Sequence, residues 1–184
     1  MRMNQGVEWA VHACTLLAPL WPDGGLPLAA LAEYHGVPAP YMAKQMQALS
    51  KAGIVRTSRG KSGGYALARP PAEITLWDVA RAIDGPEPAF RCTEIRQRGP
   101  CAAKPADCRT PCHIAQAFAL AEDAARAVLQ GMSIAQVLAD VGRDSSPAHL
   151  GEAMVWIAAQ ATRLPPGRTG SATGTGPGAI RPNG

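Results

Sequence analysis

Four of the five cysteines in this 184-residue sequence, Cys92, Cys101, Cys108 and Cys112, lie within one short stretch. The stretch is rich in proline, glycine and charged residues, which indicates a loop rather than a strand or a buried helix. Thiolates gathered in a loop can bind a metal ion, hold an iron–sulfur cluster or form disulfides. Residues 86–112 are therefore the candidate chemical centre of the chain and are called the cysteine loop below.

The spacing and surroundings of the loop cysteines favour one of these kinds of site over the others. Structural zinc sites use cysteine pairs about two to four residues apart, whereas the gaps here are eight, six and three residues long. Disulfides are disfavoured in a reducing compartment. Thiols without a role would explain one or two cysteines, but not four in a polar loop. An iron–sulfur cluster fits best, while Cys14 lies on the apolar face of a predicted helix and is most simply a core residue.

Composition and charge describe the protein around this loop. Hydrophobic residues make up 47% of the chain and charged residues 17%, which is typical of a globular protein with one core and additional elements. Residues 40–69 contain six lysines and arginines and no acidic residue, a local excess that would attract a polyanion. No apolar run is long enough to span a membrane, and Glu8 and His12 interrupt the run that could resemble a signal peptide. We therefore expect a cytoplasmic protein with no membrane partner.

The first part of the chain has the pattern of a helix-turn-helix. Apolar residues recur at helical spacing over residues 4–18, a second short helix is predicted over 28–35 and ends at Gly36, and a third begins at Pro40 and ends at Gly53. Two helices of this size joined by a glycine-containing turn are typical of DNA-binding proteins.

A small β-hairpin follows and specifies the subtype. Residues 54–58 and 65–67 have strand composition, and the turn between them is basic and glycine-rich. The fold class predicted is mainly α with a small β wing, a winged helix-turn-helix. We expect DNA contacts from the third helix and from the turn, through Tyr41, Lys44, Gln45, Arg59, Lys61, Ser62 and Gly63. The alternative is a solvated helix face in a protein-interaction domain.

Helices are predicted for most of the remaining chain. A capping-box-like Thr75–Asp78 start predicts a helix over 76–83, and an apolar stripe over 113–130 indicates a long dimerisation helix. Further helices are predicted over 134–141 and 148–161. The domain boundaries are therefore 1–85 for DNA binding, 86–112 for the cysteine loop, 113–142 for dimerisation, 143–164 for an extra helix, and 165–184 for a disordered tail.

Several of these segments resemble the Rrf2 family of bacterial transcriptional regulators, whose members include the IscR, NsrR and RsrR types. The resemblance rests on residues 8–10, 40–46, 53–55, 59–65, 74–79 and 84–85, and it extends to about residue 142. It implies a homodimeric winged-helix regulator of transcription. It also implies an iron–sulfur cluster held between the cysteine loop of one subunit and the first helix of the other.

The details of the loop are most similar to the RsrR type, which implies a 2Fe-2S cluster. The ligands implied by position are Cys92, Cys112, Glu8 and His35. From the residues alone, His35 could equally be a helix cap and Glu8 a solvated charge. Cys101 and Cys108 remain open between bystanders and alternative ligands.

These ligands suggest a redox sensor rather than an enzyme. An imidazole in place of a thiolate raises the reduction potential of a cluster. His35 ends the second predicted helix, immediately before the third, which is the DNA-recognition helix. Trp9, beside Glu8, is a candidate for a side chain that repacks on switching. Three alternatives stay open: a repressor that senses nitric oxide or iron–sulfur status through a 4Fe-4S cluster, a metal-free thiol-switch regulator, and an electron-transfer protein or enzyme subunit. No set of nucleophile, base and orienting residue supports catalysis.

Overall fold

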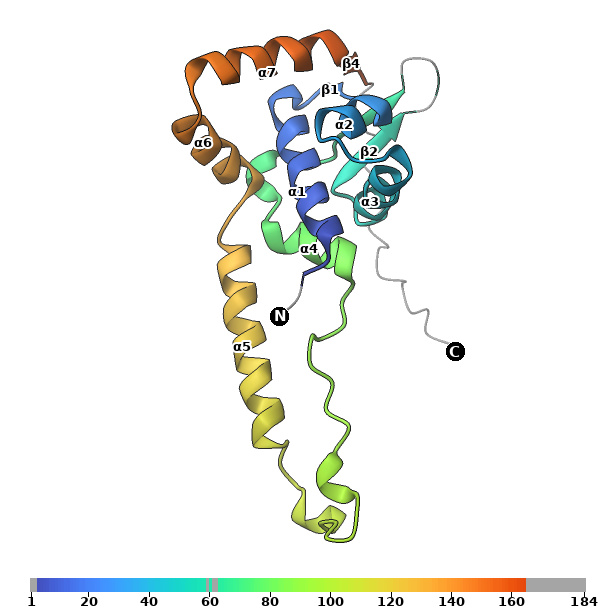
Figure 1. Cartoon of the computed structure of the whole chain (residues 1–184), viewed down its shortest axis with the longest axis vertical. Helices are drawn as coiled ribbons and strands as arrows, with labels where there is room; N and C mark the ends of the chain where they lie inside the picture. Colours follow the sequence, from blue (N-terminus) through green and yellow to red (C-terminus); the bar gives the residue numbers. More distant parts are fainter. Residues whose placement is uncertain (1–2, 59, 61–62, 165–184) are drawn as a thin grey trace, which may run out of the picture.

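A computed structural model describes residues 3–58, 60 and 63–164 of the chain. Helix α1 (Gln5–Leu17) lies at the centre of its main body (Figure 1). Ala10, Ala13 and Leu17 of this helix are completely buried. Helices α3, α4 and α6 all pack against it. Burial raises the pKa of the Cys14 thiol to about 12, so this cysteine is an unreactive core residue.

The predicted helix-turn-helix is present as α2 (Leu28–Tyr34) and α3 (Ala39–Lys51). Gly36 and Gly53, which follow the two helices, have φ values of 61° and 69°. Side chains rarely adopt this left-handed conformation, which explains why glycine ends both helices. Met42, Met46 and Leu49 of α3 are fully buried and anchor the helix to the body.

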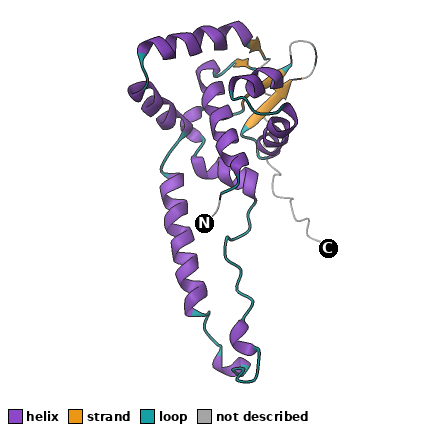
Figure 2. Cartoon of the chain, viewed as in Figure 1, coloured by secondary structure: helices purple, strands orange, loops and turns teal. Residues whose placement is uncertain are grey.

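The wing is the antiparallel pair β2 (Val55–Ser58) and β3 (Gly64–Leu67), in register from Val55 opposite Leu67 to Ser58 opposite Gly64 (Figure 2). A second pair joins β1 (Gly24–Gly25) to β4 (Thr162–Arg163), which the sequence did not predict. The backbone of Leu26 also exchanges two hydrogen bonds with that of Tyr65, at 2.8 and 2.9 Å. The chain beyond α7 is therefore connected through β1 to the wing.

The remaining helices are α4 (Leu76–Asp84), α5 (His113–Gln130), α6 (Ile134–Asp144) and α7 (Pro147–Gln160), and short 3₁₀ helices cover Ala18–Leu20, Pro71–Glu73, Ile95–Gln97 and Pro105–Asp107. The predicted capping box at the start of α4 is present, with Thr75 and Asp78 each accepting a backbone N–H of the other. The mainly helical fold class with a small wing is confirmed. The predicted disordered tail, 165–184, lies outside the described residues.

Helix α5 and the cysteine loop form a long projection from the body (Figure 1). None of the residues of α5 is buried, and its apolar side chains Ile114, Phe118 and Val128 are 62%, 50% and 68% exposed. Phe118 stacks on Phe90 of the cysteine loop with 4.5 Å between ring centroids. Among the described residues, no helix is long and apolar enough to cross a membrane.

Candidate functional site

Helix α3 presents a polar face on the side opposite its buried methionines. Pro38 and Pro40 favour a helix start here, because proline fixes a helical φ and needs no N–H partner in the first turn. Tyr41 is 58% exposed, and Lys44 is exposed. A phenol and an ammonium on one accessible helix face can donate hydrogen bonds to phosphates or base edges.

Gln45 differs from the sequence prediction that it projects toward DNA. Its side chain is only 6% exposed, and its Nε2 donates a hydrogen bond to the Tyr41 carbonyl at 3.3 Å. It packs directly over Gly6 of α1, where a Cβ atom would lie 2.6 Å from Gln45 Oε1. The amide therefore joins α1 to α3 and is not on the reading face.

The wing turn is described only in part. Arg59, Lys61 and Ser62 lie outside the described residues, so their predicted contacts remain predictions. Gly63 is half-buried, and its N–H donates to the Gly60 carbonyl at 2.9 Å. Gly60 has a φ of 105°, which closes this turn and requires glycine.

Trp9 connects α1 to the recognition helix. Its ring lies 6.0 Å from the ring of Tyr41, edge to face at 65°. The neighbouring residue Glu8 is exposed on α1. The predicted switch residue therefore contacts a predicted DNA-binding residue, and any rotation of Trp9 would change the packing of Tyr41.

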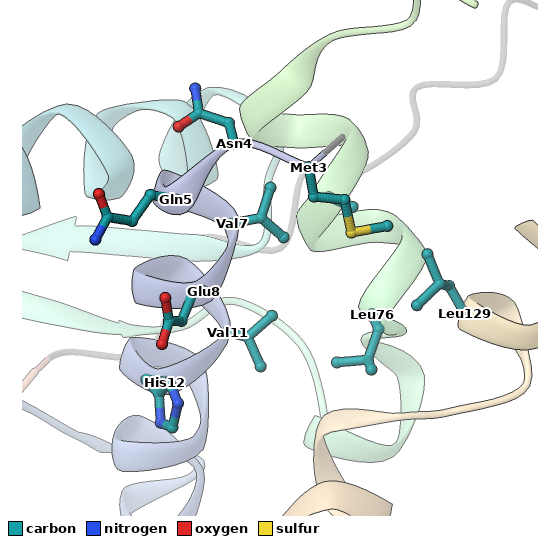
Figure 3. Close-up of a pocket in the computed structure, with 10 residues that line it drawn as sticks. Met3, Asn4, Gln5, Val7, Glu8, Val11, His12, Leu76 and Leu129 are labelled. Carbon is teal, nitrogen blue, oxygen red and sulfur yellow. The ribbon is translucent and has the colours of Figure 1, made fainter. Parts of the chain in front are cut away.

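Glu8 and His12 lie one turn apart on an exposed side of α1, while Val7 and Val11 point toward α4 (Figure 3). Both polar residues line a cavity of about 390 Å³ together with Leu76 and Leu129. A carboxylate and an imidazole at i and i+4 are neighbours on a helix surface and can bind one metal-containing group. His12 is not among the ligands predicted from the sequence, although its i, i+4 spacing from Glu8 could have identified it.

His35, the histidine that the resemblance implied, lies behind His12. The two rings are 5.5 Å apart between centroids. His35 is half-buried, and its buried Nε2 has no hydrogen-bond partner among the described residues. The pKa of His35 is lowered, mainly by burial and also by the nearby His12, against an opposing hydrogen bond with the His12 backbone.

Arg96 organises the cysteine loop. Its guanidinium contacts the Glu94 carboxylate at 2.5 and 2.9 Å and donates to the Thr110 carbonyl at 3.1 Å, which joins the two halves of the loop. The pKa of Arg96 is raised by the Glu94 hydrogen bond and also by the neighbouring Cys108 and Cys112 thiols. The positive charge of Arg96 therefore lies close to two of the four loop cysteines.

The loop thiols are accessible, but they are distant from α1 of the same chain. Cys92 and Cys101 are exposed, and Cys108 and Cys112 are half-exposed. Within the described part of one chain, no three His, Cys, Asp or Glu side chains form a metal site. The part of the cysteine loop around the short helices Ile95–Gln97 and Pro105–Asp107 lies at the far end of the projection, away from α1 and α2 (Figure 1). One chain therefore holds the predicted ligands in two separate groups.

Comparison with known proteins identifies a family whose sequences resemble this chain. A model of the Rrf2 family, described as an iron-dependent transcriptional regulator, matches residues 3–140. Rv1287 from Mycobacterium tuberculosis, whose name describes a helix-turn-helix-type transcriptional regulator, is 38% identical over 91 residues, covering 50% of this chain and 56% of that protein. The transcriptional regulator IscR of Photorhabdus laumondii is 34% identical over 92 residues, with coverages of 50% and 56%. The chain thus spans about half the length of these curated relatives.

Solved structures support the same fold. The structure of T. potens IscR has a TM-score of 0.60 at 22% identity and covers 82% of this chain and 96% of its own. CymR, the global cysteine regulator of B. subtilis, has a TM-score of 0.57 at 22% identity, with coverages of 76% and 97%. These relatives and neighbours are regulators by name, which agrees with the expectation of a regulator rather than an enzyme.

Proposed function

The chain belongs to the Rrf2 family of transcriptional regulators, and from this premise we propose that it is a homodimeric, cytoplasmic DNA-binding regulator controlled by a 2Fe-2S cluster. The observation that carries the proposal is the contact between Trp9 and Tyr41, because it connects the helix of the candidate ligand Glu8 to the recognition helix. Helix α3 and the basic wing supply the DNA-binding surface, through Tyr41, Lys44 and the wing turn.

The exposed apolar face of α5 supports dimerisation. Ile114, Phe118 and Val128 are each at least half exposed, on a helix with no buried residue. A second copy packed against this face would remove these side chains from water. It would also carry the cysteine loop of one chain toward α1 of the other, which joins the two separated groups of ligands.

The chemistry of the donor groups fits such a cluster. Cys92 and Cys112 would supply accessible thiolates from one subunit, and Glu8 of the partner subunit would supply a carboxylate. The cluster would provide a one-electron redox change. For the imidazole, the resemblance favours His35, whereas the geometry favours His12, because His12 is exposed beside Glu8 and the Nε2 of His35 is buried.

The chain's own residues would then transmit the signal. A change of charge at Glu8 alters the electrostatic surroundings of Trp9, the next residue on α1. Trp9 repacks against Tyr41, and α3 changes its position relative to the wing. Gln45 makes this coupling direct, since it fixes α3 to α1 at Gly6.

The test is the metal content and DNA affinity of anaerobically purified protein. We expect iron and sulfide in the protein, a strong loss of both in Cys92→Ala and Cys112→Ala, and little loss in the matched Cys101→Ala variant. Oxidised and reduced protein should bind a DNA fragment selected from a random library with different affinities. Equal affinities would refute redox control. Mössbauer spectra typical of a 4Fe-4S cluster would refute the 2Fe-2S assignment and support the alternative sensor.

A metal-free thiol switch is the second candidate, and the position of Arg96 favours it. Its guanidinium lies near Cys108 and Cys112, two partly accessible cysteines that an oxidant could join in a disulfide. This candidate predicts that metal-free protein loses or gains DNA affinity on treatment with peroxide, with a Cys108–Cys112 disulfide detectable by mass spectrometry. The Cys108→Ser variant, which the cluster proposal leaves active, would abolish that response.

A further inference from the structure

A second cavity lies between α1, the end of α2, α6 and α7. Its volume is about 360 Å³, and its walls are mostly aliphatic side chains, including Leu16, Leu138, Leu150 and Ile157. In Figure 1, α7 crosses above the upper end of α1 and α2 and forms the roof of this region. Since the family model matches residues 3–140 only, the roof is built from the part of the chain beyond that match.

The polar side chains that line this cavity are histidines, a threonine and a tyrosine. Three of the four histidines of the chain, His12, His35 and His149, line it together with Thr15 and Tyr34. Of the residues that the structure describes, no lysine, arginine, aspartate or glutamate lines it. The buried Nε2 of His35 has no hydrogen-bond partner within residues 3–58, 60 and 63–164, and a buried polar atom without a hydrogen bond is unfavourable.

We propose that this cavity binds a small, mainly apolar molecule that ends in a hydrogen-bond acceptor, such as the carboxylate of a short fatty or aromatic acid. The aliphatic walls bury the body of the molecule, and the O–H of Tyr34 and the imidazole N–H of His149 donate to its acceptor. The volume is in the range of small-molecule sites, which begins at about 300 Å³. The molecule acts as an effector, a second input besides the proposed cluster.

The roof helix provides a route from this cavity to the wing. Trp156 of α7 lies 5.0 Å from Tyr34, between ring centroids, at the cavity wall. Beyond α7, strand β4 pairs with β1, and the N–H of the fully buried Leu164 donates to the Asp23 carbonyl at 2.8 Å. Strand β1 in turn leads to Leu26, which is bonded to Tyr65 of the wing. A ligand that shifts α7 therefore shifts the wing, and we expect it to change DNA affinity.

Calorimetric titration of the full-length, metal-free dimer with octanoate and octylamine tests this proposal. Both probes have the same apolar body, but only octanoate ends in an acceptor. We expect one octanoate site per chain and at least about tenfold weaker binding of octylamine. Equal affinities for the two probes, or no octanoate binding up to its solubility limit, would overturn the proposal.

Two variants locate the binding. Ala153→Trp fills the cavity and should abolish octanoate binding, whereas Val155→Trp changes a side chain that is 73% exposed on the same helix and should leave it intact. His149→Phe removes an imidazole from the cavity wall at similar shape and should weaken octanoate by about tenfold while leaving octylamine unchanged. Equal binding to the two tryptophan variants would place the probe on the surface and refute the site. Because these titrations use metal-free protein, their failure is distinct from a failure of the cluster proposal.

Discussion

The imidazole ring of His12 on α1 lies 5.5 Å from the ring of His35 at the end of α2, with the two planes tilted by 56°. The exposed ring of His12 faces the cavity that Glu8 also lines, and the half-buried ring of His35 belongs to the turn of the helix-turn-helix, where it caps the end of α2. A change in the charge or position of His12 therefore acts directly on His35. This contact places one histidine beside the proposed cluster and the other where the signal reaches α2.

Replacing each histidine separately distinguishes the two roles. We expect His12→Ala to lower the iron content strongly, because it removes an exposed ligand beside Glu8. His35→Ala should retain most of the iron but reduce the difference in DNA affinity between oxidised and reduced protein. Iron analysis and anaerobic fluorescence anisotropy measure both effects, with His113→Ala at the start of α5 as a control. Loss of iron in His35→Ala alone would return the ligand assignment to His35.

Lys44 and Gln45 are adjacent in α3 but should behave differently. Lys44→Ala should weaken DNA binding and lower the slope of log affinity against log salt by about one, since one phosphate contact is lost. Gln45→Ala should leave that slope unchanged but lower the free energy of unfolding by about 1–2 kcal/mol, because it removes a buried contact with Gly6. Anisotropy over a range of salt concentrations and urea unfolding measure the two effects. A reduced salt slope in Gln45→Ala would contradict its buried position.

The helix-turn-helix could be predicted from the sequence, whereas the burial of Gln45 could not. Local signals such as the glycines at 36 and 53 identified the helix-turn-helix, because each reports a backbone requirement of its own segment. Gln45 lies on the same helix face as Met42 and Leu49, but its polarity suggested DNA contact. Gln45 is buried because it packs against Gly6 of α1, and this contact between two helices cannot be read from the sequence of α3 alone.

Non-local pairings were missed for the same reason. Strands β1 and β4 contain two residues each and lie about 140 positions apart, so neither has a detectable pattern. The contact of His12 with His35 likewise depends on how α1 packs against α2. The proposed cluster site is the extreme case, since the tip of the cysteine loop lies away from α1 within one chain.

Asp78 should make stability depend on pH. Burial raises its pKa, but hydrogen bonds from Thr75 and the Arg69 guanidinium outweigh that effect, so the pKa is lowered from its ordinary value of 3.8. A lowered folded pKa stabilises the protein above the unfolded pKa, and this contribution is lost as pH falls through the folded pKa. Asp78→Ala should therefore cost about 1 kcal/mol at neutral pH, mostly through the lost cap, because the ion pair with Arg69 is about one-third exposed.

The difference between wild type and Asp78→Ala should shrink as the pH is lowered below about 4. Urea unfolding at several pH values measures it. Asp140→Ala, which removes a surface pair on α6, is the matched control and should change stability by less than about 0.5 kcal/mol. A pH-independent difference for Asp78→Ala would show that the carboxylate charge does not contribute.

Mixed dimers test whether each proposed cluster site uses two chains. We consider a heterodimer of one Glu8→Ala chain and one Cys92→Ala chain, purified through two different affinity tags. If the loop of one chain meets α1 of the other, one site combines both defects and the other has none, so the heterodimer should hold about half of the wild-type iron. If each site is built within a single chain, both sites carry a defect and the heterodimer should hold as little iron as the two mutant homodimers. The distance of the cysteine loop from α1 within one chain favours the first outcome (Figure 1). Iron as low as in the homodimers would refute the shared site even if DNA binding by the dimer remained intact.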